Sequence, residues 1–92
     1  MIHVQYNSLT PLEKRLKREE YIKHQDGNCW YCQHTLSEKP PAKVMRKALN
    51  FRLFPSGFFR YPVHLQHDHK TGLTEGAVHA YCNAVLWQYH GR

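Results

Sequence analysis

The chain lacks several features that would assign it to common protein classes. No stretch approaches the roughly 18 consecutive apolar residues of a membrane span, and the first residues show no basic start followed by an apolar run. The cysteines number three, so a framework of disulfides would leave one thiol unpaired. There are no repeats or low-complexity tracts. These absences favour a soluble protein of a reducing, cytoplasmic compartment, with its thiols available to a metal.

The chain is also short, and its size limits the core that it can build. With 92 residues, of which 41% are hydrophobic, it is expected to form one domain over residues 1–92. A domain of this size buries only a modest share of its surface on folding, so we expect an additional staple.

Two pairs of candidate metal ligands could provide this additional stabilisation of the fold. Cys29-x-x-Cys32 and His79-x-x-Cys82 each place two ligands three residues apart, and 46 residues separate the pairs. Zinc prefers four tetrahedral sulfur and imidazole ligands, and a closed set of four is structural rather than catalytic. Such an ion would supply folding free energy of the order of 10 kcal/mol. The alternative is a buried, unliganded Cys-x-x-Cys with His79 as an ordinary strand residue.

Local patterns predict a mixed α and β order. Thr10, Pro11 and Glu13 form a helix start with a cap, a proline in the first turn and a capping box, and the helix is expected to run to about residue 24. We expect Leu12 and Leu16 on one face, with Tyr21 and Ile22 further along the helix, and its charged residues on a solvated face. Further along, the sequence predicts a helix over residues 42–49, a hairpin of residues 51–54 and 58–61, strands at 63–67 and 77–79, and a helix over 82–90.

The positive charge is concentrated in the middle of the chain. Of the net charge of +6, five units lie in residues 37–62, which carry six Lys and Arg against one acid. A basic segment of this kind suits a polyanionic partner. Its aromatic residues Phe58, Phe59 and Tyr61 could stack on unpaired bases, but core packing is the favoured interpretation. The cations expected to contact phosphates are Lys43, Arg46, Lys47, Arg52 and Arg60.

The last third of the chain carries a histidine-rich run. His67-Asp68-His69-Lys70-Thr71-Gly72, then Gly76 and His79-x-x-Cys82-Asn83, follow the first cysteine pair. Together these residues resemble the recombination endonuclease VII branch of the HNH, or ββα-metal, nucleases. The likeness covers roughly residues 10–36 and 63–90. It implies a small α+β, zinc-stapled ββα-metal domain in which residues 10–36 hold a helix and the first zinc knuckle, 37–62 form an inserted basic helix and hairpin arm, and 63–90 form the ββα-metal motif.

The resemblance also implies roles for individual residues. It makes His67 the general base, Asn83 a ligand of a catalytic Mg²⁺ or Mn²⁺ ion, and the two pairs the ligands of one structural zinc. His64, His69 and Lys70 are further candidates for phosphate contact. Asn83 could instead cap the last helix.

The sequence departs from the family pattern at three positions. His79 stands where cysteine is usual, Glu75 stands where arginine is usual, and Gln66 replaces the aspartate that binds the catalytic metal. A neutral amide holds Mg²⁺ weakly. Gln66 could ligate with help from DNA phosphates, Asp68 could supply the carboxylate after a local shift, or the site could be degenerate.

These observations predict a metal-dependent DNA endonuclease. His67, with an ordinary pKa near 6.5, is mostly neutral at pH 7 and can take a proton from an attacking water. The alternative functions are a zinc-stabilised nucleic-acid-binding module with a decayed site, and a zinc knuckle for protein contacts, which the basic arm disfavours. One motif makes one cut, so cleavage of both strands would need a homodimer or a second event. The small size and the resemblance fit a phage-encoded protein acting in a bacterial host.

Overall fold

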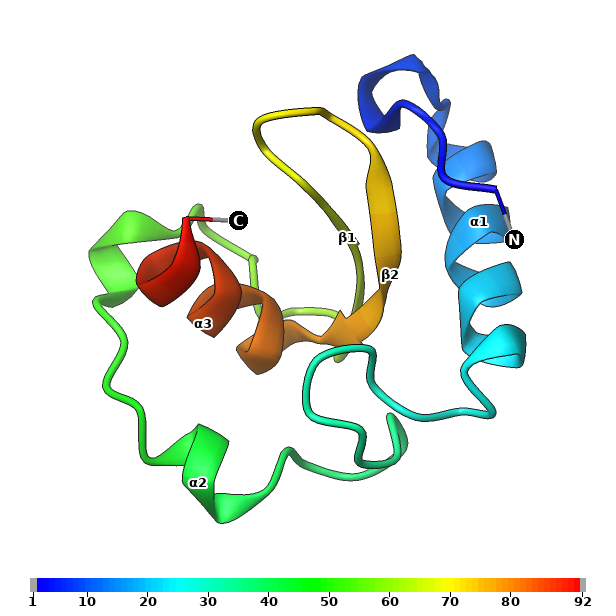
Figure 1. The fold of residues 1–92 in the computed structure, drawn as a ribbon. Coiled ribbons are helices and arrows are strands. Elements are labelled where there is room, and N and C mark those ends of the chain that lie inside the picture. The colour runs from blue at the N-terminus through cyan, green and yellow to red at the C-terminus, as the bar shows by residue number, and fades with distance from the viewer. Residues whose placement is uncertain (1, 92) are drawn as a thin grey trace.

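The computed structural model describes residues 2–91 as a small α+β domain. Its two strands form one antiparallel hairpin, with α1 on one side and α3 on the other (Figure 1). No helix in this part of the chain has the length and apolar character needed to cross a membrane. In chain order the elements are a 3-10 helix (Tyr6–Ser8), α1 (Pro11–His24), α2 (Ala42–Met45), a second 3-10 helix (Phe51–Leu53), β1 (Val63–His67), β2 (Thr74–His79) and α3 (Ala80–His90).

The first helix begins where its capping residues predict. The Thr10 hydroxyl accepts a hydrogen bond from the Glu13 backbone N–H at 3.1 Å, and the Glu13 carboxylate accepts one from the Thr10 N–H at 2.9 Å. These reciprocal bonds satisfy two backbone donors that the helix itself leaves unpaired. The predicted start and end of α1 are therefore confirmed.

The prediction of the apolar face of α1 is wrong for Leu12 and Leu16. Leu12 and Leu16 are 61% and 54% exposed, whereas Tyr21 is buried and its hydroxyl lies 2.8 Å from the Thr74 side-chain oxygen. Lys14 and Arg18, four residues apart, share the inward side with Tyr21 and are half-buried. The contact of Tyr21 with Thr74 of β2 sets the rotation of α1. This rotation turns Lys14 and Arg18 towards the interior of the protein.

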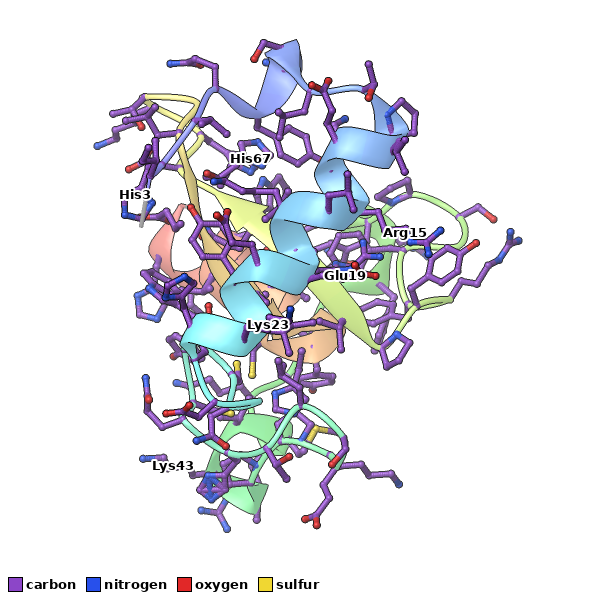
Figure 2. All side chains as sticks on the ribbon, turned by 90° about the vertical axis from the view of Figure 1, so that its right-hand side faces the viewer. His3, Arg15, Glu19, Lys23, Lys43 and His67 are labelled. Carbon is purple, nitrogen blue, oxygen red and sulfur yellow. The ribbon has the colours of Figure 1, made fainter. Side chains whose placement is uncertain are left out.

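The outer face of α1 carries charged residues. Figure 2 shows Arg15, Glu19 and Lys23 on the side of α1 that faces away from the hairpin. Arg15 and Glu19 approach to 3.5 Å, but both side chains are more than half exposed, so solvent screens this pair.

The hairpin is regular except at the end of β1. Leu65 pairs with Ala77 and Gln66 with Gly76, but His67 pairs with Thr74, so Glu75 is an extra residue on β2. An irregularity of this kind re-aims the side chains next to it. β2 begins at Thr74 and α3 at Ala80, earlier than residues 77 and 82 as predicted.

The core lies on both sides of the hairpin and is small. The apolar residues buried there are Tyr21, Leu36, Val44, Leu65, Ala77, Val78, Val85 and Leu86, together with Cys29 and Cys82. Two of the cysteines are thus core residues as well as candidate ligands.

The middle segment differs most from its prediction. The second helix is a single turn, Ala42–Met45, rather than residues 42–49, and the predicted hairpin of residues 51–61 is instead a 3-10 helix followed by turns. Its aromatic rings pack on each other and on α3, with the Phe54 and Trp87 ring centroids 5.5 Å apart. Phe54 and Phe58 are half-buried, but Phe59 and Tyr61 are 37% and 66% exposed, so the prediction of core packing is wrong for these two residues. Phe54 packs on α3 instead of pairing in a strand.

Candidate metal centre and adjoining cavity

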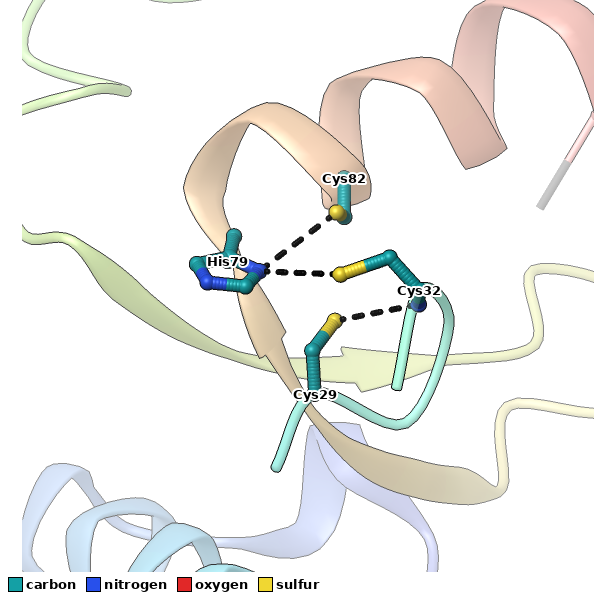
Figure 3. A group of neighbouring side chains, drawn as sticks. All are labelled: Cys29, Cys32, His79 and Cys82. Atoms are coloured by element: carbon teal, nitrogen blue, oxygen red, sulfur yellow. Dashed lines mark hydrogen bonds between the residues drawn. The ribbon is translucent and has the colours of Figure 1, made fainter. Parts of the chain in front are cut away.

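The four predicted zinc ligands meet at one point of the fold. Cys29 and Cys32 lie in the loop after α1, His79 ends β2, and Cys82 lies in the first turn of α3 (Figure 3). Their ligand atoms all lie within 4.8 Å of one another. Residues far apart in the sequence thus form a group that could hold a metal ion, and the chemistry of three sulfurs and one imidazole suits zinc.

Distances within this group fit a tetrahedral ion. The Nδ1 atom of His79 lies 3.5 Å from the Cys32 sulfur and 3.6 Å from the Cys82 sulfur. Ligand atoms at ordinary zinc distances, about 2.0–2.3 Å, would be spaced about this far apart around a tetrahedron. The four side chains therefore need little movement to hold an ion.

The imidazole of His79 is also oriented for metal binding. Its Nε2 atom lies 2.9 Å from the Thr35 carbonyl and 2.8 Å from the Glu38 carbonyl. Because carbonyl oxygens only accept, Nε2 carries the hydrogen and the Nδ1 lone pair faces the sulfurs. Backbone partners of this kind commonly fix the tautomer of a zinc-bound histidine.

The thiol of Cys29 is the most easily deprotonated of the three. A hydrogen bond from Cys82, helped by backbone N–H groups such as that of Cys32, lowers the pKa of Cys29 to about 4 against the opposing effect of burial. The pKa of Cys82 is raised, first by its bond to Cys29. A thiolate is the form that binds zinc, so the cluster already favours one charged sulfur.

The loop that carries Cys29 and Cys32, the candidate first zinc knuckle, is held directly against β2. The Gln25 side-chain amide donates to the Ala77 carbonyl at 2.9 Å and accepts from the Ala77 backbone N–H at 3.0 Å. The backbone N–H of Trp30 donates to the same carbonyl at 2.9 Å. A Cβ atom at Gly76 would lie 2.7 Å from the Trp30 ring. The close approach of the knuckle to the strand thus requires glycine at position 76.

A cavity of about 630 Å³ lies along β1 and holds several of the predicted site residues. His64, His67 and Asn83 all line it, as does His69. It extends from α1 to the aromatic segment and α3. Its other lining residues are Tyr6, Pro11, Lys14, Arg18, Leu53, Phe54, Pro55, Phe58, Tyr61, Val63, Leu65 and Trp87.

His67 lies in a stack of rings. The Tyr6 ring is nearly parallel to the His67 imidazole, with ring centroids 4.0 Å apart. The His69 ring also stacks on the His67 imidazole, with centroids 4.6 Å apart. The ammonium group of Lys14 lies 4.2 Å from the Tyr6 ring centre. Burial lowers the pKa of His67. The nearby charges of His69 and Lys14 lower that pKa further, whereas the charge of Asp68 raises it. The imidazole is therefore neutral at pH 7 and available as a base.

His64 and Asn83 contact each other across the cavity. The Asn83 amide nitrogen lies 3.0 Å from His64 Nδ1. Burial lowers the pKa of His64, while the backbone of Phe58 and Tyr61 raises it, as carbonyl acceptors of an imidazole N–H do. The cap residue of α3 is His79, so the alternative role of Asn83 as a helix cap is wrong.

Gln66 and Asp68, the other two candidate ligands of the catalytic metal, lie outside the cavity lining. Gln66 is 1% exposed, its amide nitrogen donates to the His67 carbonyl at 2.9 Å, and its Oε1 has no hydrogen-bond partner among residues 2–91. Asp68 accepts from the Lys70 N–H at 2.7 Å and stabilises the turn between the strands. Neither residue lines the cavity formed by the described part of the chain.

The predicted basic arm does not supply the cations of this cavity. Its six Lys and Arg residues are exposed and lie outside the lining, and Lys43 is at the opposite end of the molecule from His67 (Figure 2). Lys70 is exposed on the turn between the strands. The lining cations are instead Lys14 and Arg18, which the charge pattern of α1 assigned to solvent.

Sequence reasoning therefore missed the residues of α1 and of the N-terminal segment that line the cavity. Tyr6 carries no motif, and nothing local marks it as a neighbour of His67. For Lys14 and Arg18 a signal exists, since both lie on the helical face of Tyr21.

Comparison with protein-family models, with curated proteins and with solved structures found no match to this chain.

Proposed function

We propose that this protein is a nucleic-acid endonuclease of the ββα-metal type, stapled by one structural zinc at Cys29, Cys32, His79 and Cys82. The observation that carries the proposal is that His64, His67 and Asn83 line one cavity together with Lys14 and Arg18. A neutral imidazole, an amide and two cations in one cavity are groups that can bind and hydrolyse a phosphodiester. No acidic side chain of the described residues lines the cavity to repel the phosphate.

His67 would act as the general base. Its lowered pKa leaves the imidazole unprotonated at neutral pH, so it can remove a proton from water as the water oxygen attacks phosphorus. The bond from phosphorus to the leaving oxygen then breaks, and that oxygen gains a proton from solvent. Lys14 and Arg18 would hold the negative charge of the phosphate close to the base.

The residues of the cavity fit Mg²⁺ poorly. That ion relies on carboxylates, and the described lining contains none. His64 and Asn83, 3.0 Å apart, are close enough for one ion to contact both, once the amide turns its oxygen towards the imidazole. An imidazole nitrogen suits a borderline cation such as Ni²⁺, and an amide oxygen suits Mn²⁺. A cation held there would stabilise negative charge on the phosphate and the leaving oxygen.

A plasmid assay tests the activity. Supercoiled DNA is incubated with the zinc-loaded protein and added Mn²⁺, Ni²⁺ or Mg²⁺, and nicked and linear products are counted. We expect nicking with Mn²⁺ or Ni²⁺ to exceed that with Mg²⁺, and His67→Ala to lose at least 100-fold in rate. His34→Ala, an exposed histidine outside the cavity, is the matched control. Nicking that persists in His67→Ala would contradict the proposed base.

A second function is favoured by one specific observation. Since the described lining has no carboxylate and Gln66 is buried away from it, the cavity could bind nucleic acid without cutting it. Such a module would bind DNA in a salt-dependent way and show no nicking with any of the three cations. A protein-binding zinc knuckle would show neither property.

A further inference from the structure

One wall of the cavity is made of aromatic rings that nothing in the proposed hydrolysis uses. Phe54, Phe58 and Trp87 line it, with centroid separations of 4.9 Å between the two phenylalanines and 5.5 Å from Phe54 to Trp87. Trp87 remains 37% exposed. The Phe58 ring meets the His64 imidazole edge-on at 4.8 Å, so the rings continue up to the proposed reaction centre.

The opposite wall is cationic. Lys14 and Arg18 come from α1, on the other side of the hairpin, and both are half-buried. A ligand that fills this space must therefore offer a flat apolar group to one wall and negative charge to the other. The volume of about 630 Å³ lies within the range of small-molecule sites, about 300–1,000 Å³.

A nucleotide has this combination of groups, provided that its base is free. In a continuous duplex the bases are stacked within the helix, and only the phosphates and groove edges are accessible. An unpaired base can leave the stack and lie on aromatic side chains, which accept every base because every base has a flat face. The charge of the opposite wall then meets the phosphate of the same nucleotide.

We propose that the cavity binds an unpaired nucleotide of a nucleic-acid strand, with its base against Phe54, Phe58 and Trp87 and its phosphate near His67, Lys14 and Arg18. This inference rests on the proposed function and specifies its substrate. The preferred substrate is a single strand, loop or flap, and an uninterrupted duplex is a poorer one.

Binding without added divalent cation tests the inference separately from cleavage. The zinc-loaded protein is titrated into fluorescein-labelled dT15, into a matched 15-base-pair duplex, and into that duplex with three unpaired thymidines at its centre. We expect dT15 and the looped duplex to bind at least 10-fold more tightly than the continuous duplex. Equal affinity for all three would overturn the proposal.

Substitutions assign the binding to the ring wall. Phe54→Leu and Phe58→Leu are each expected to weaken dT15 binding by about 10-fold and to weaken duplex binding by a smaller factor. Phe51→Leu is the matched control, because Phe51 is 62% exposed and lies outside the cavity lining. Zinc content and circular dichroism show that each variant is folded. If both cavity variants bind dT15 as tightly as the control, the ring wall is not the base site.

Tryptophan fluorescence gives an independent readout. The chain has two tryptophans, and only Trp87 lines this cavity. We therefore expect dT15 to quench the tryptophan emission of the unaltered protein, and we expect this quenching to be absent in Trp87→Phe. Quenching that persists in that variant would overturn the assignment.

A third arm separates the strand from a free nucleotide. Thymidine 5′-monophosphate is expected to compete only at concentrations at least 100-fold above those of dT15, because it lacks the neighbouring phosphates. Competition at equal concentrations would contradict a strand as the occupant. Ring-dependent dT15 binding without nicking would uphold this inference and reject the nuclease. Nicking of continuous duplex that survives in Phe54→Leu and Phe58→Leu would do the reverse.

Discussion

The ring of Tyr6 lies on the imidazole of His67, with centroids 4.0 Å apart and planes 13° from parallel. The 3-10 helix that carries Tyr6 is fixed to the hairpin by the bond from the Tyr6 N–H to the Gly72 carbonyl, 2.8 Å long. The N-terminal segment thus covers one face of the proposed base and shields that face from water.

Replacing Tyr6 should change the pH dependence of nicking. Burial holds the pKa of His67 below its ordinary value, so its base form persists to lower pH. In Tyr6→Leu the imidazole becomes more exposed and its pKa rises, which moves the acidic limb of the pH–rate profile to higher pH. Lys14→Gln should move it in the same direction, because one nearby positive charge is lost. Titration of the His67 ring protons by NMR measures the shift directly.

A substitution on an exposed part of α1 provides the control for this prediction. Arg15→Gln removes a cation from the outer face of the same helix and should leave the pKa of His67 unchanged. An identical acidic limb in Tyr6→Leu, Arg15→Gln and the unaltered protein would contradict the role of Tyr6.

Removal of zinc should unfold the domain. The proposed ion joins the loop after α1 to the start of α3, and structural zinc contributes about 10–16 kcal/mol in small zinc-finger domains. We expect one zinc per chain by elemental analysis, loss of helical circular dichroism on chelation, and the same loss in Cys82→Ser. Cobalt should replace zinc and give the intense visible absorption of a tetrahedral sulfur site. A folded, metal-free protein would contradict this prediction.

Adding a methyl group at Gly76 should destabilise the fold. A Cβ there would lie 2.7–2.8 Å from Trp30 and Gln25, the residues that hold the first zinc knuckle against β2. Gly76→Ala is expected to lower the free energy of unfolding by about 1–3 kcal/mol. Urea denaturation of the zinc-loaded protein measures the loss. Ser56→Ala, on an exposed turn, should change stability by less than about 0.5 kcal/mol, and an equally small effect of Gly76→Ala would show that the knuckle can move away.

Gln66→Asp distinguishes a buried structural residue from a metal ligand. The side chain at position 66 is 1% exposed, so an aspartate there must either carry a buried charge or stay protonated. We expect a loss of about 1–3 kcal/mol at pH 7 that becomes smaller as the pH falls towards 4, since the protonated carboxyl is less costly to bury. Gln66→Leu, which removes the unpaired Oε1, should cost less.

Thermal unfolding with and without Mg²⁺ decides between the two roles. If position 66 is outside the cation site, added Mg²⁺ leaves the melting temperature of Gln66→Asp unchanged. A large and selective rise with Mg²⁺ would instead support the metal-ligand role that the family resemblance implies.

Much of the site was predictable because its signals are local. The capping box fixes the start of α1 through bonds between residues three apart, and the Cys-x-x-Cys spacing brings two ligands to one point within a single turn. The aromatic segment was not predictable in the same way. Its β-prone residue Phe54 packs against Trp87, far along the chain, and a packing partner overrides local propensity.

The sequence by itself determined the start of α1, the two strands of the β1–β2 hairpin and the identity of the four candidate zinc ligands, because each depends on spacing between near neighbours or on side-chain chemistry. Only the tertiary structure decided which residues surround His67. The rotation of α1 follows from the contact of Tyr21 with Thr74, and this contact turns Lys14 and Arg18 inward while Leu12 and Leu16 face solvent. A helix has several faces of similar polarity, and the surface against which it packs selects the one that is buried.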